Sequence, residues 1–151
     1  MKGETDMTHV LKATVTLVTG DRFAAATGSG GATDLAPAAE NGAATGAVSP
    51  MEALLVALAG CLGMSVAPIL RKMRQPVSRY EVRARGELTM RPPRVFEAIA
   101  VEHIFTGAGF DRHAIERAVT LAEERYCGAS VMLGKAAHIT HTITCIETGQ
   151  S

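Results

Sequence analysis

The chain lacks a net charge, and its sequence leads us to expect neither a secretory signal nor a membrane-spanning run. Lysine plus arginine and aspartate plus glutamate number 15 each, so no general attraction draws it to nucleic acid or to anionic membranes. Its polar start, Met1 to Asp6, has no apolar signal segment behind it. We expect no uninterrupted apolar run long enough to cross a bilayer. We therefore expect a cytoplasmic protein with neither a nucleic-acid nor a membrane partner.

Cysteine is scarce, and its spacing excludes several classes of protein. Cys61, Cys127 and Cys145 are too few and too far apart for the disulfide framework of a secreted protein. No CxxC occurs, which removes the basis for a zinc ribbon or a thioredoxin-like motif. In a reducing cytoplasm each cysteine is either a small buried apolar residue or a reactive thiol. The buried role is the better expectation for an arbitrary cysteine.

Metal and nucleotide sites have no signature here either. His138 and His141 are three residues apart on an expected strand, so they face opposite sides of its sheet and cannot share an ion without distortion. The other histidines, which form no cluster with this pair in the sequence, are His9, His103 and His113. Residues 28–31 are rich in glycine, but no Gly-Lys-Ser/Thr follows them. We expect surface or hydrogen-bonded histidines, no metal and no bound organic cofactor.

What the chain does contain is an alternation of strand and helix patterns. Its 151 residues are 47% apolar, which suits one domain, residues 1–151, with a proper core. Period-two alternation and turn residues predict strands at 11–19, 22–27, 32–35, 79–89, 95–105 and 137–147. Helices are predicted from Ser49 to about Met73 and from Asp111 to about Gly128. This order indicates an α+β fold, with a flexible tail at 1–9 and a mobile loop at 36–48.

The first predicted helix has a strong start signal. Serine caps it, proline suits the first helical position and Glu52 completes a capping box in Ser49-Pro50-Met51-Glu52. Apolar residues surround the helix almost entirely up to Leu70, so we expect it to be the buried central helix. Pro68 removes one backbone hydrogen bond and should kink the helix near its end.

Cys61 lies in the middle of this helix, between Gly60 and Gly63. It gains nothing from a helix N-terminus there, and a buried thiol stays protonated and inert unless a nearby cation holds the thiolate. The small residues around it leave room for a pocket or for close backbone approach. Composition alone still favours a structural cysteine.

The sequence predicts different roles for the other two cysteines. Cys127 lies at the C-terminal end of the second long helix, where the negative end of the dipole disfavours a thiolate. It is therefore a poor first nucleophile, but it can attack an oxidised partner later. Cys145 shares a strand face with Ile139 and Ile143, which places it in the core.

Glu52 can be interpreted as a structural or as a functional residue. It is explained structurally as the acid of the capping box. Nine residues separate it from Cys61, about two and a half helical turns, so the two side chains lie on opposite faces of a straight helix. If Glu52 serves a Cys61 site, we expect that site to be in a partner subunit.

Two cysteine motifs together resemble a known family. The segment Ser49-Pro50-Met51-Glu52-Ala53-Leu54-Leu55-Val56-Ala57-Leu58-Ala59-Gly60-Cys61 resembles the central-helix motif of the OsmC/Ohr family, the osmotically induced and organic-hydroperoxide-resistance proteins. Glu124-Arg125-Tyr126-Cys127-Gly128 is similar to its second signature, and 80–82 with 93–99 look like its strand pair. The resemblance covers about Thr14 to Ile146 and is nearest the OsmC-like branch.

The resemblance implies a fold and a site. The fold would be OsmC-like, with antiparallel sheets packed around a buried central helix in an intertwined homodimer. Two active sites would lie at the subunit interface, each with Cys61 as peroxidatic and Cys127 as resolving cysteine. Arg22 would activate Cys61, and Glu52 would orient that arginine.

The leading hypothesis is a two-cysteine peroxidase for organic hydroperoxides. Cys61 would become a sulfenic acid, and Cys127 would condense with it to a disulfide. The Leu, Met and Ala residues around Cys61 favour an apolar substrate over hydrogen peroxide, and the resemblance implies a dithiol reductant such as a lipoylated protein. A non-enzymatic dimeric protein that binds small molecules remains an alternative, and a redox sensor is a third.

Overall fold

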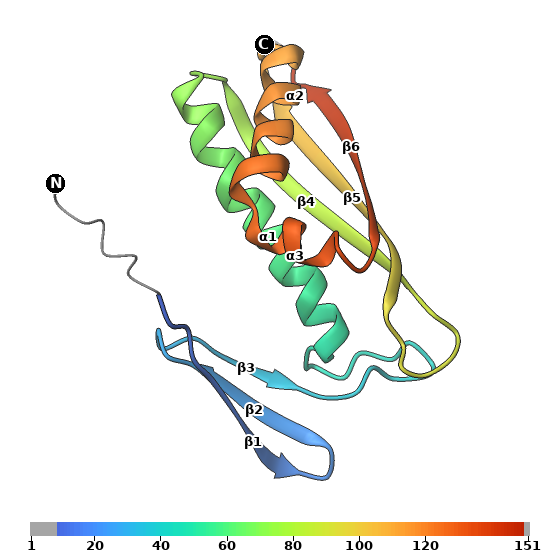
Figure 1. Ribbon diagram of the computed structural model, residues 1–151. Helices are drawn as coiled ribbons and strands as arrows, with labels where there is room; N and C mark the ends of the chain where they lie inside the picture. Colours follow the sequence, from blue (N-terminus) through green and yellow to red (C-terminus); the bar gives the residue numbers. More distant parts are fainter. Residues whose placement is uncertain (1–8, 150–151) are drawn as a thin grey trace, which may run out of the picture. The chain divides into compact units, whose positions relative to one another are not determined.

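Figure 1 shows a computed structural model that describes residues 9–149 of the chain. The flexible tail expected at 1–9 lies outside the described residues, apart from His9. The chain divides into two compact units, one ending at Ala53 and the other beginning at Leu54, and each is described by itself. The expectations of a single domain and of a mobile loop at 36–48 stay predictions.

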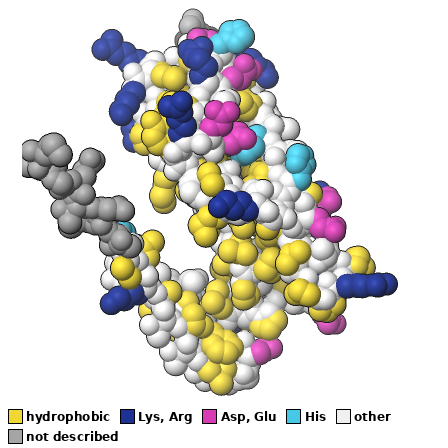
Figure 2. All heavy atoms as spheres, viewed as in Figure 1, with side chains coloured by type: hydrophobic (Ala, Val, Ile, Leu, Met, Phe, Trp, Pro, Cys, Tyr) yellow, Lys and Arg dark blue, Asp and Glu magenta, His cyan; other side chains and the backbone are white. Residues whose placement is uncertain are grey.

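The first unit contains a three-stranded antiparallel sheet of order β1-β2-β3. Its strands are β1 (Ala13–Thr19), β2 (Arg22–Thr27) and β3 (Ala32–Leu35), which confirms the three predicted strands. The turn between β1 and β2 needs Gly20, whose φ of 56° is costly for residues with a side chain. Every position of β1 is exposed, and hydrophobic side chains lie at the surface of this sheet, among them Val15, Leu17 and Phe23 (Figure 2).

Helix α1 (Pro50–Lys72) begins with the predicted capping box. Oε2 of Glu52 accepts hydrogen bonds from the backbone N–H of Ser49 at 2.9 Å and from its hydroxyl at 2.7 Å. In return, Oγ of Ser49 accepts from the backbone N–H of Glu52 at 3.3 Å. These bonds satisfy backbone and side-chain donors that the helix start would otherwise leave unpaired.

Within one chain, α1 is buried along a single stripe. The buried residues, which recur at four-residue spacing, are Leu58, Leu62, Val66 and Leu70. Met64 is 80% exposed, so the expected burial on nearly all sides is wrong for the isolated chain. A sheet covers only one face of a helix that lies on it, and in this unit Gly63 of α1 faces Val82 of the next strand.

The length and apolarity of α1 also correct the expectation about long apolar runs. Its 23 residues reach a mean hydropathy of 2.2 over an 18-residue window, so by length and composition it could cross a bilayer. The core helix of a soluble protein passes the same test, and the buried stripe of α1 contributes Val66 and Leu70 to the core of the second unit. We therefore describe α1 as a core helix.

The second unit contains a mixed sheet of order β4-β5-β6. β4 (Val77–Leu88) and β5 (Phe96–Gly107) form the predicted antiparallel pair. β6 (His138–Glu147) runs parallel to β5, so the expectation of wholly antiparallel sheets is wrong here. The reason is the helical crossover between β5 and β6, which returns the chain to the end at which β5 began. The α+β class is confirmed.

The crossover consists of three consecutive helical segments: α2 (Arg112–Leu121), the π-helix η1 (Ala122–Tyr126) and α3 (Gly128–Leu133). Asp111 caps α2 as predicted, because its side chain accepts from the backbone N–H of His113 at 2.9 Å. Ile115, Ala118 and Val119 of α2 pack with Phe105 of β5 in the hydrophobic core.

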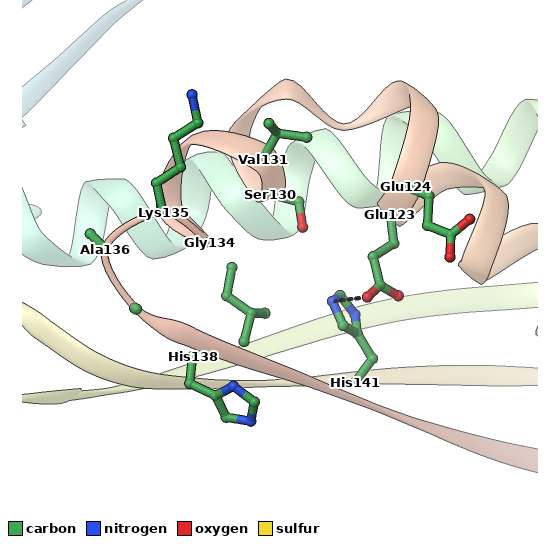
Figure 3. Close-up of a pocket in the computed structure, with 11 residues that line it drawn as sticks. Glu123, Glu124, Ser130, Val131, Gly134, Lys135, Ala136, His138 and His141 are labelled. Atoms are coloured by element: carbon green, nitrogen blue, oxygen red, sulfur yellow. Dashed lines mark ion pairs between the residues drawn. The ribbon is translucent and has the colours of Figure 1, made fainter.

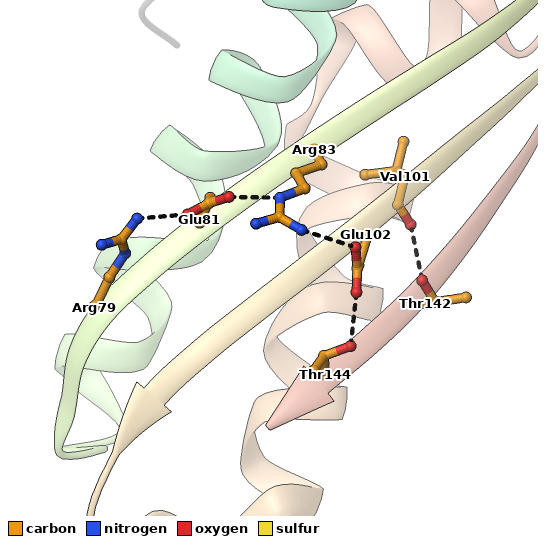
Figure 4. Close-up of polar contacts among 7 residues, drawn as sticks. All are labelled: Arg79, Glu81, Arg83, Val101, Glu102, Thr142 and Thr144. Carbon is orange, nitrogen blue, oxygen red and sulfur yellow. Dashed lines mark hydrogen bonds and ion pairs between the residues drawn. The ribbon is translucent and has the colours of Figure 1, made fainter. Parts of the chain in front are cut away.

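The other face of the mixed sheet carries charged and polar side chains (Figure 4). Glu81 of β4 accepts from Arg79 at 2.7 Å and from Arg83 at 2.6 Å, and these bonds hold the pKa of its carboxyl below the ordinary value. On β5, Glu102 accepts from the hydroxyl of Thr144 at 2.9 Å. The sheet of this unit therefore has one solvent-exposed face and one face that packs against helices.

Candidate thiol site

Cys61 lies on α1 between the buried residues Leu58 and Leu62, and its own side chain is half-buried. The hydroxyl of Ser65 donates to the carbonyl oxygen of Cys61 at 2.8 Å, a bond from serine back to the preceding turn of its own helix. The helix therefore fixes the backbone of Cys61 while leaving one side of its thiol accessible.

Cys127 lies at the junction of two helices, which corrects its predicted place at the end of one long helix. Its backbone N–H donates to the carbonyl of Ala122 at 2.8 Å and closes the π-turn. Its extended conformation, φ −90° and ψ 95°, ends η1 and makes Cys127 the N-cap of α3. In that role, Sγ accepts from the backbone N–H of Ser130 at 3.3 Å.

The fold places the thiols of Cys61 and Cys127 close enough for Cys61 to affect the ionisation of Cys127. Cys127 is only 1% exposed. Burial first, and then the neighbouring Cys61 thiol, raise the pKa of the Cys127 thiol to about 11, although the backbone N–H of Ser130 acts in the opposite sense. Cys127 is therefore a neutral thiol at pH 7, as expected of a poor first nucleophile. The dominant cause is burial, not the helix dipole.

Arg22 and Glu52 both have partners within the first unit. On β2, the guanidinium of Arg22 pairs with Asp34 of β3 at 2.9 Å and donates to the carbonyl of Thr45 at 3.4 Å. Glu52 is held by Ser49, which lowers the pKa of its carboxyl through a side-chain and a backbone hydrogen bond. Among the described residues, no ion pair joins Arg22 to Glu52. These two residues belong to the first unit, whereas both thiols belong to the second.

Cys145 lies on the inner face of β6, half-buried against the hydrophobic core together with Ile143. Burial raises the pKa of its thiol. Its predicted place in the core is confirmed.

The sequence prediction missed a buried group of polar side chains. Tyr80, His103, His141 and Glu123 come from β4, β5, β6 and η1 and lie in contact one after another. The sequence shows no cluster that joins His103 to His141, but β5 and β6 pair side by side and bring the two together. The expectation of hydrogen-bonded histidines is confirmed for this pair. Strand parity could have revealed the group, since His103 lies two residues from the buried Val101 and Phe105.

The histidines nevertheless do not form a metal centre in the part of the chain that the structure describes, where no group of three or more His, Cys, Asp or Glu side chains could hold an ion. His138 is exposed whereas His141 points inward, which confirms that the pair faces opposite sides of the sheet. In the described residues, the polar neighbours of the inward histidine are His103 and Glu123 instead.

Comparison with known proteins identifies the family. The family profile described as OsmC-like protein matches residues 41–142, a stretch that contains both Cys61 and Cys127. The chain belongs to the OsmC-like family. Protein YhfA of Escherichia coli K12 is 43% identical over 96 residues, which cover 64% of this chain and 72% of that relative.

Solved structures of other OsmC-like proteins share the fold. The OsmC-like protein of Mycoplasma pneumoniae matches with a TM-score of 0.79 and 16% identity, covering 93% of this chain and all of that one. The organic hydroperoxide resistance protein OsmC of Legionella pneumophila matches with a TM-score of 0.67 and 18% identity, covering 90% of this chain and 97% of that one. At these identities the likeness establishes a common fold.

Proposed function

We propose that this OsmC-like protein is a two-cysteine peroxidase that reduces organic hydroperoxides. The observation that carries the proposal is the proximity of the Cys61 and Cys127 thiols, which lie close enough for Cys61 to affect the pKa of Cys127. They come from α1 and from the η1–α3 junction. A disulfide requires two sulfurs that can approach closely without backbone rearrangement. Membership of a family whose structural relatives include organic hydroperoxide resistance proteins supports the same reaction.

The reaction proceeds in two balanced steps. The thiolate of Cys61 attacks the terminal oxygen of the hydroperoxide, the O–O bond breaks, and the alkoxide leaves as an alcohol after it takes up a proton. Cys61 is then a sulfenic acid. Cys127 attacks its sulfur, the S–O bond breaks, and the hydroxide leaves with the Cys127 proton as water. An external dithiol, which we propose to be a lipoylated protein, reduces the disulfide again.

Arg22 and Glu52 complete the proposed site in a homodimer. The Arg22–Asp34 pair is partly exposed, and such surface pairs contribute only about 0–1 kcal/mol. Arg22 can therefore exchange Asp34 for the Cys61 thiolate at little cost. The hydrogen bonds that Glu52 accepts from Ser49 all end on Oε2, which leaves Oε1 for a guanidinium.

A largely apolar groove one helical turn from Cys61 supports an apolar substrate. A cavity of about 540 Å³ in the second unit begins one turn after Cys61. It is lined by Met64, Ser65, Pro68, Ile69, Lys72, Met73, Leu121 and Tyr126. Its walls favour a hydrocarbon chain over hydrogen peroxide. The proposed homodimer is supported by the exposed apolar side chains of β1, β2 and α1, because exposed apolar patches often mark protein interfaces.

The test is quenched-flow oxidation of the reduced protein by cumene hydroperoxide, with mass mapping of the cysteines, because the chain has no Trp to report by fluorescence. We expect rapid, stoichiometric formation of a Cys61–Cys127 disulfide. Cys127→Ser should stop at a Cys61 sulfenic acid, and Cys61→Ser should not react. Oxidation of Cys61 at no more than the rate of a free thiol would contradict the proposal. In that case, the contacts of Arg22 with Asp34 and Thr45 would indicate that Arg22 does not activate Cys61. The alternative, a non-enzymatic dimer that binds small molecules, would then be favoured.

A further inference from the structure

Four polar side chains form a continuous line through the second unit, from β4 to η1. The hydroxyl of Tyr80 lies 2.7 Å from Nδ1 of His103. Nε2 of His103 lies 3.1 Å from Nδ1 of His141. Nε2 of His141 then lies 3.4 Å from Oε1 of Glu123, the contact drawn as a dashed line in Figure 3. The line therefore runs from the sheet to the helical segment that precedes Cys127.

Burial keeps the two histidines neutral at pH 7. His103 is fully buried, and burial together with the neighbouring His141 lowers its pKa to about 4. Burial also lowers the pKa of His141, although the carboxylate of Glu123 acts in the opposite sense. The pKa of Tyr80 is raised by burial, so its hydroxyl stays protonated. Each imidazole in the line therefore carries a single N–H.

These protonation states give the hydrogen bonds one direction. Tyr80 donates to Nδ1 of His103, so the proton of His103 is on Nε2 and is donated to Nδ1 of His141. The proton of His141 is then on Nε2, facing the carboxylate of Glu123. The opposite direction would place a bare nitrogen lone pair against that carboxylate, which is repulsive. The line therefore presents an N–H donor to Glu123.

The N–H donor of His141 at the end of this line lacks a hydrogen-bond acceptor in the part of the chain that the structure describes. Within the described residues, Nε2 of His141 is buried without a hydrogen-bond partner, and the His141 side chain is 9% exposed. The distance of 3.4 Å to Glu123 exceeds the usual 2.7–3.2 Å of an N–H···O bond. An unpaired buried donor costs about 1–3 kcal/mol, so a small movement of Glu123 toward His141 is favourable.

Glu123 is structurally tied to Cys127. It lies in η1, the π-turn that the N–H of Cys127 closes by donating to Ala122 at 2.8 Å. Ser130, whose N–H donates to Sγ of Cys127, lines the same cavity of about 560 Å³ as His141 and Glu123. Figure 3 shows the side chains of Ser130, Glu123 and His141 turned toward one another across this cavity. The backbone of Glu123 is thus part of the turn that holds Cys127.

We infer that His141 and Glu123 are positioning residues for Cys127: their contact sets the position of the π-turn and so the approach of the Cys127 sulfur to Cys61. The inference rests on the proposed function in assigning Cys127 to the second step, in which the S–S bond forms and water leaves. Small displacements of a reacting group cost about ten- to a hundredfold in rate. Loss of the contact should therefore slow disulfide formation and leave oxidation of Cys61 unchanged.

The kinetic test resolves the two steps by quenched flow. Glu123→Ala should form the disulfide about ten- to a hundredfold more slowly than the unmodified protein. Glu123→Gln should restore part of the rate, because its amide oxygen can accept a hydrogen bond from His141. Glu124→Ala, one residue further along η1, is the matched control and should keep the full rate. Equal second-step rates in Glu123→Ala and Glu124→Ala would overturn the inference.

A second measurement does not depend on peroxidase activity. Histidine NMR titrations compare the reduced protein with a Cys61–Cys127 disulfide made by diamide. If the His141–Glu123 contact positions Cys127, formation of the disulfide must in turn affect His141, because linkage is reciprocal. The His141 imidazole should therefore titrate at different midpoints in the reduced and disulfide forms. Glu123→Ala should abolish that difference. An unchanged His141 midpoint would overturn the inference. Absence of peroxide-driven disulfide would instead count against the proposed function, and the titration would still decide the positioning role.

Discussion

The backbone N–H of Ser130 donates to Sγ of Cys127 at 3.3 Å, and this bond opposes the burial that keeps the thiol protonated. The bond favours the thiolate, yet the pKa of Cys127 still rises to about 11 because burial dominates. The result is a thiol that is inert toward solvent reagents and placed beside Cys61. Such a thiol suits the second step of the proposed reaction better than the first.

Cys127 should react slowly with iodoacetamide at neutral pH. Because its pKa is about 11, the thiolate fraction and the alkylation rate should rise about tenfold per pH unit from pH 7 to 10. Mass mapping of alkylated peptides measures Cys127 in the presence of the other two cysteines. A rate that levels off below pH 9 would contradict the raised pKa.

Stability should fall in mild acid because of His103. Its folded pKa of about 4 lies below the unfolded value of about 6.5, so the unfolded chain binds the proton first as pH falls. The free energy of unfolding should therefore decrease from about pH 6.5 toward pH 4. Circular dichroism melts measure it, and His103→Gln should show a shallower decline than the exposed control His113→Gln. Equal slopes in the two variants would contradict the assignment.

Tyr80→Phe should lower the free energy of unfolding by about 0.5–1.5 kcal/mol, since it removes the hydroxyl that donates to His103. The ring stacking of Tyr80 on Phe105, with centroids 4.5 Å apart, would remain. Tyr126→Phe is the matched control, because Tyr126 is largely exposed. Urea titrations of both variants compare the two losses. A Tyr80→Phe protein as stable as the control would show that the bond contributes nothing.

Gly86→Ala should destabilise the mixed sheet. A Cβ at Gly86 would overlap the ring of Phe96 on the paired strand β5, and Phe96 is itself buried. Overpacking of this kind costs about 1–3 kcal/mol. Gly60→Ala is the control, because its Cβ would meet no atom within 4 Å and alanine favours the α1 helix by about 1 kcal/mol. Thermal melts should therefore shift in opposite directions.

Arg22 and Asp34 test the proposed activation of Cys61. If Arg22 must leave Asp34 to reach Cys61, Asp34→Asn should raise the rate of Cys61 oxidation by cumene hydroperoxide. Arg22→Ala should lower that rate by about a hundredfold or more, as expected for loss of a charge that stabilises a reacting anion. Quenched-flow traces give both rates. Equal oxidation rates for Arg22→Ala and the unmodified protein would remove Arg22 from the mechanism.

Local signals in the sequence determined most of the elements. The capping box at Ser49 and Glu52 depends on contacts three residues apart, so the start of α1 could be predicted from the chain alone. The Asp111 cap and the strand alternation that placed Cys145 inside are of the same kind. The two cysteine motifs indicate the family from the sequence alone, because their sequence neighbourhoods are distinctive.

The tertiary structure alone decided what depends on pairing between distant segments. That β6 lies parallel to β5 follows from the path of the crossover, which no local pattern records, and it brings His141 beside His103. The π-turn that makes Cys127 an N-cap arises because one extra residue is accommodated before α3. Side-chain pKa values follow in turn, since burial and neighbouring charges exist only once the chain is packed.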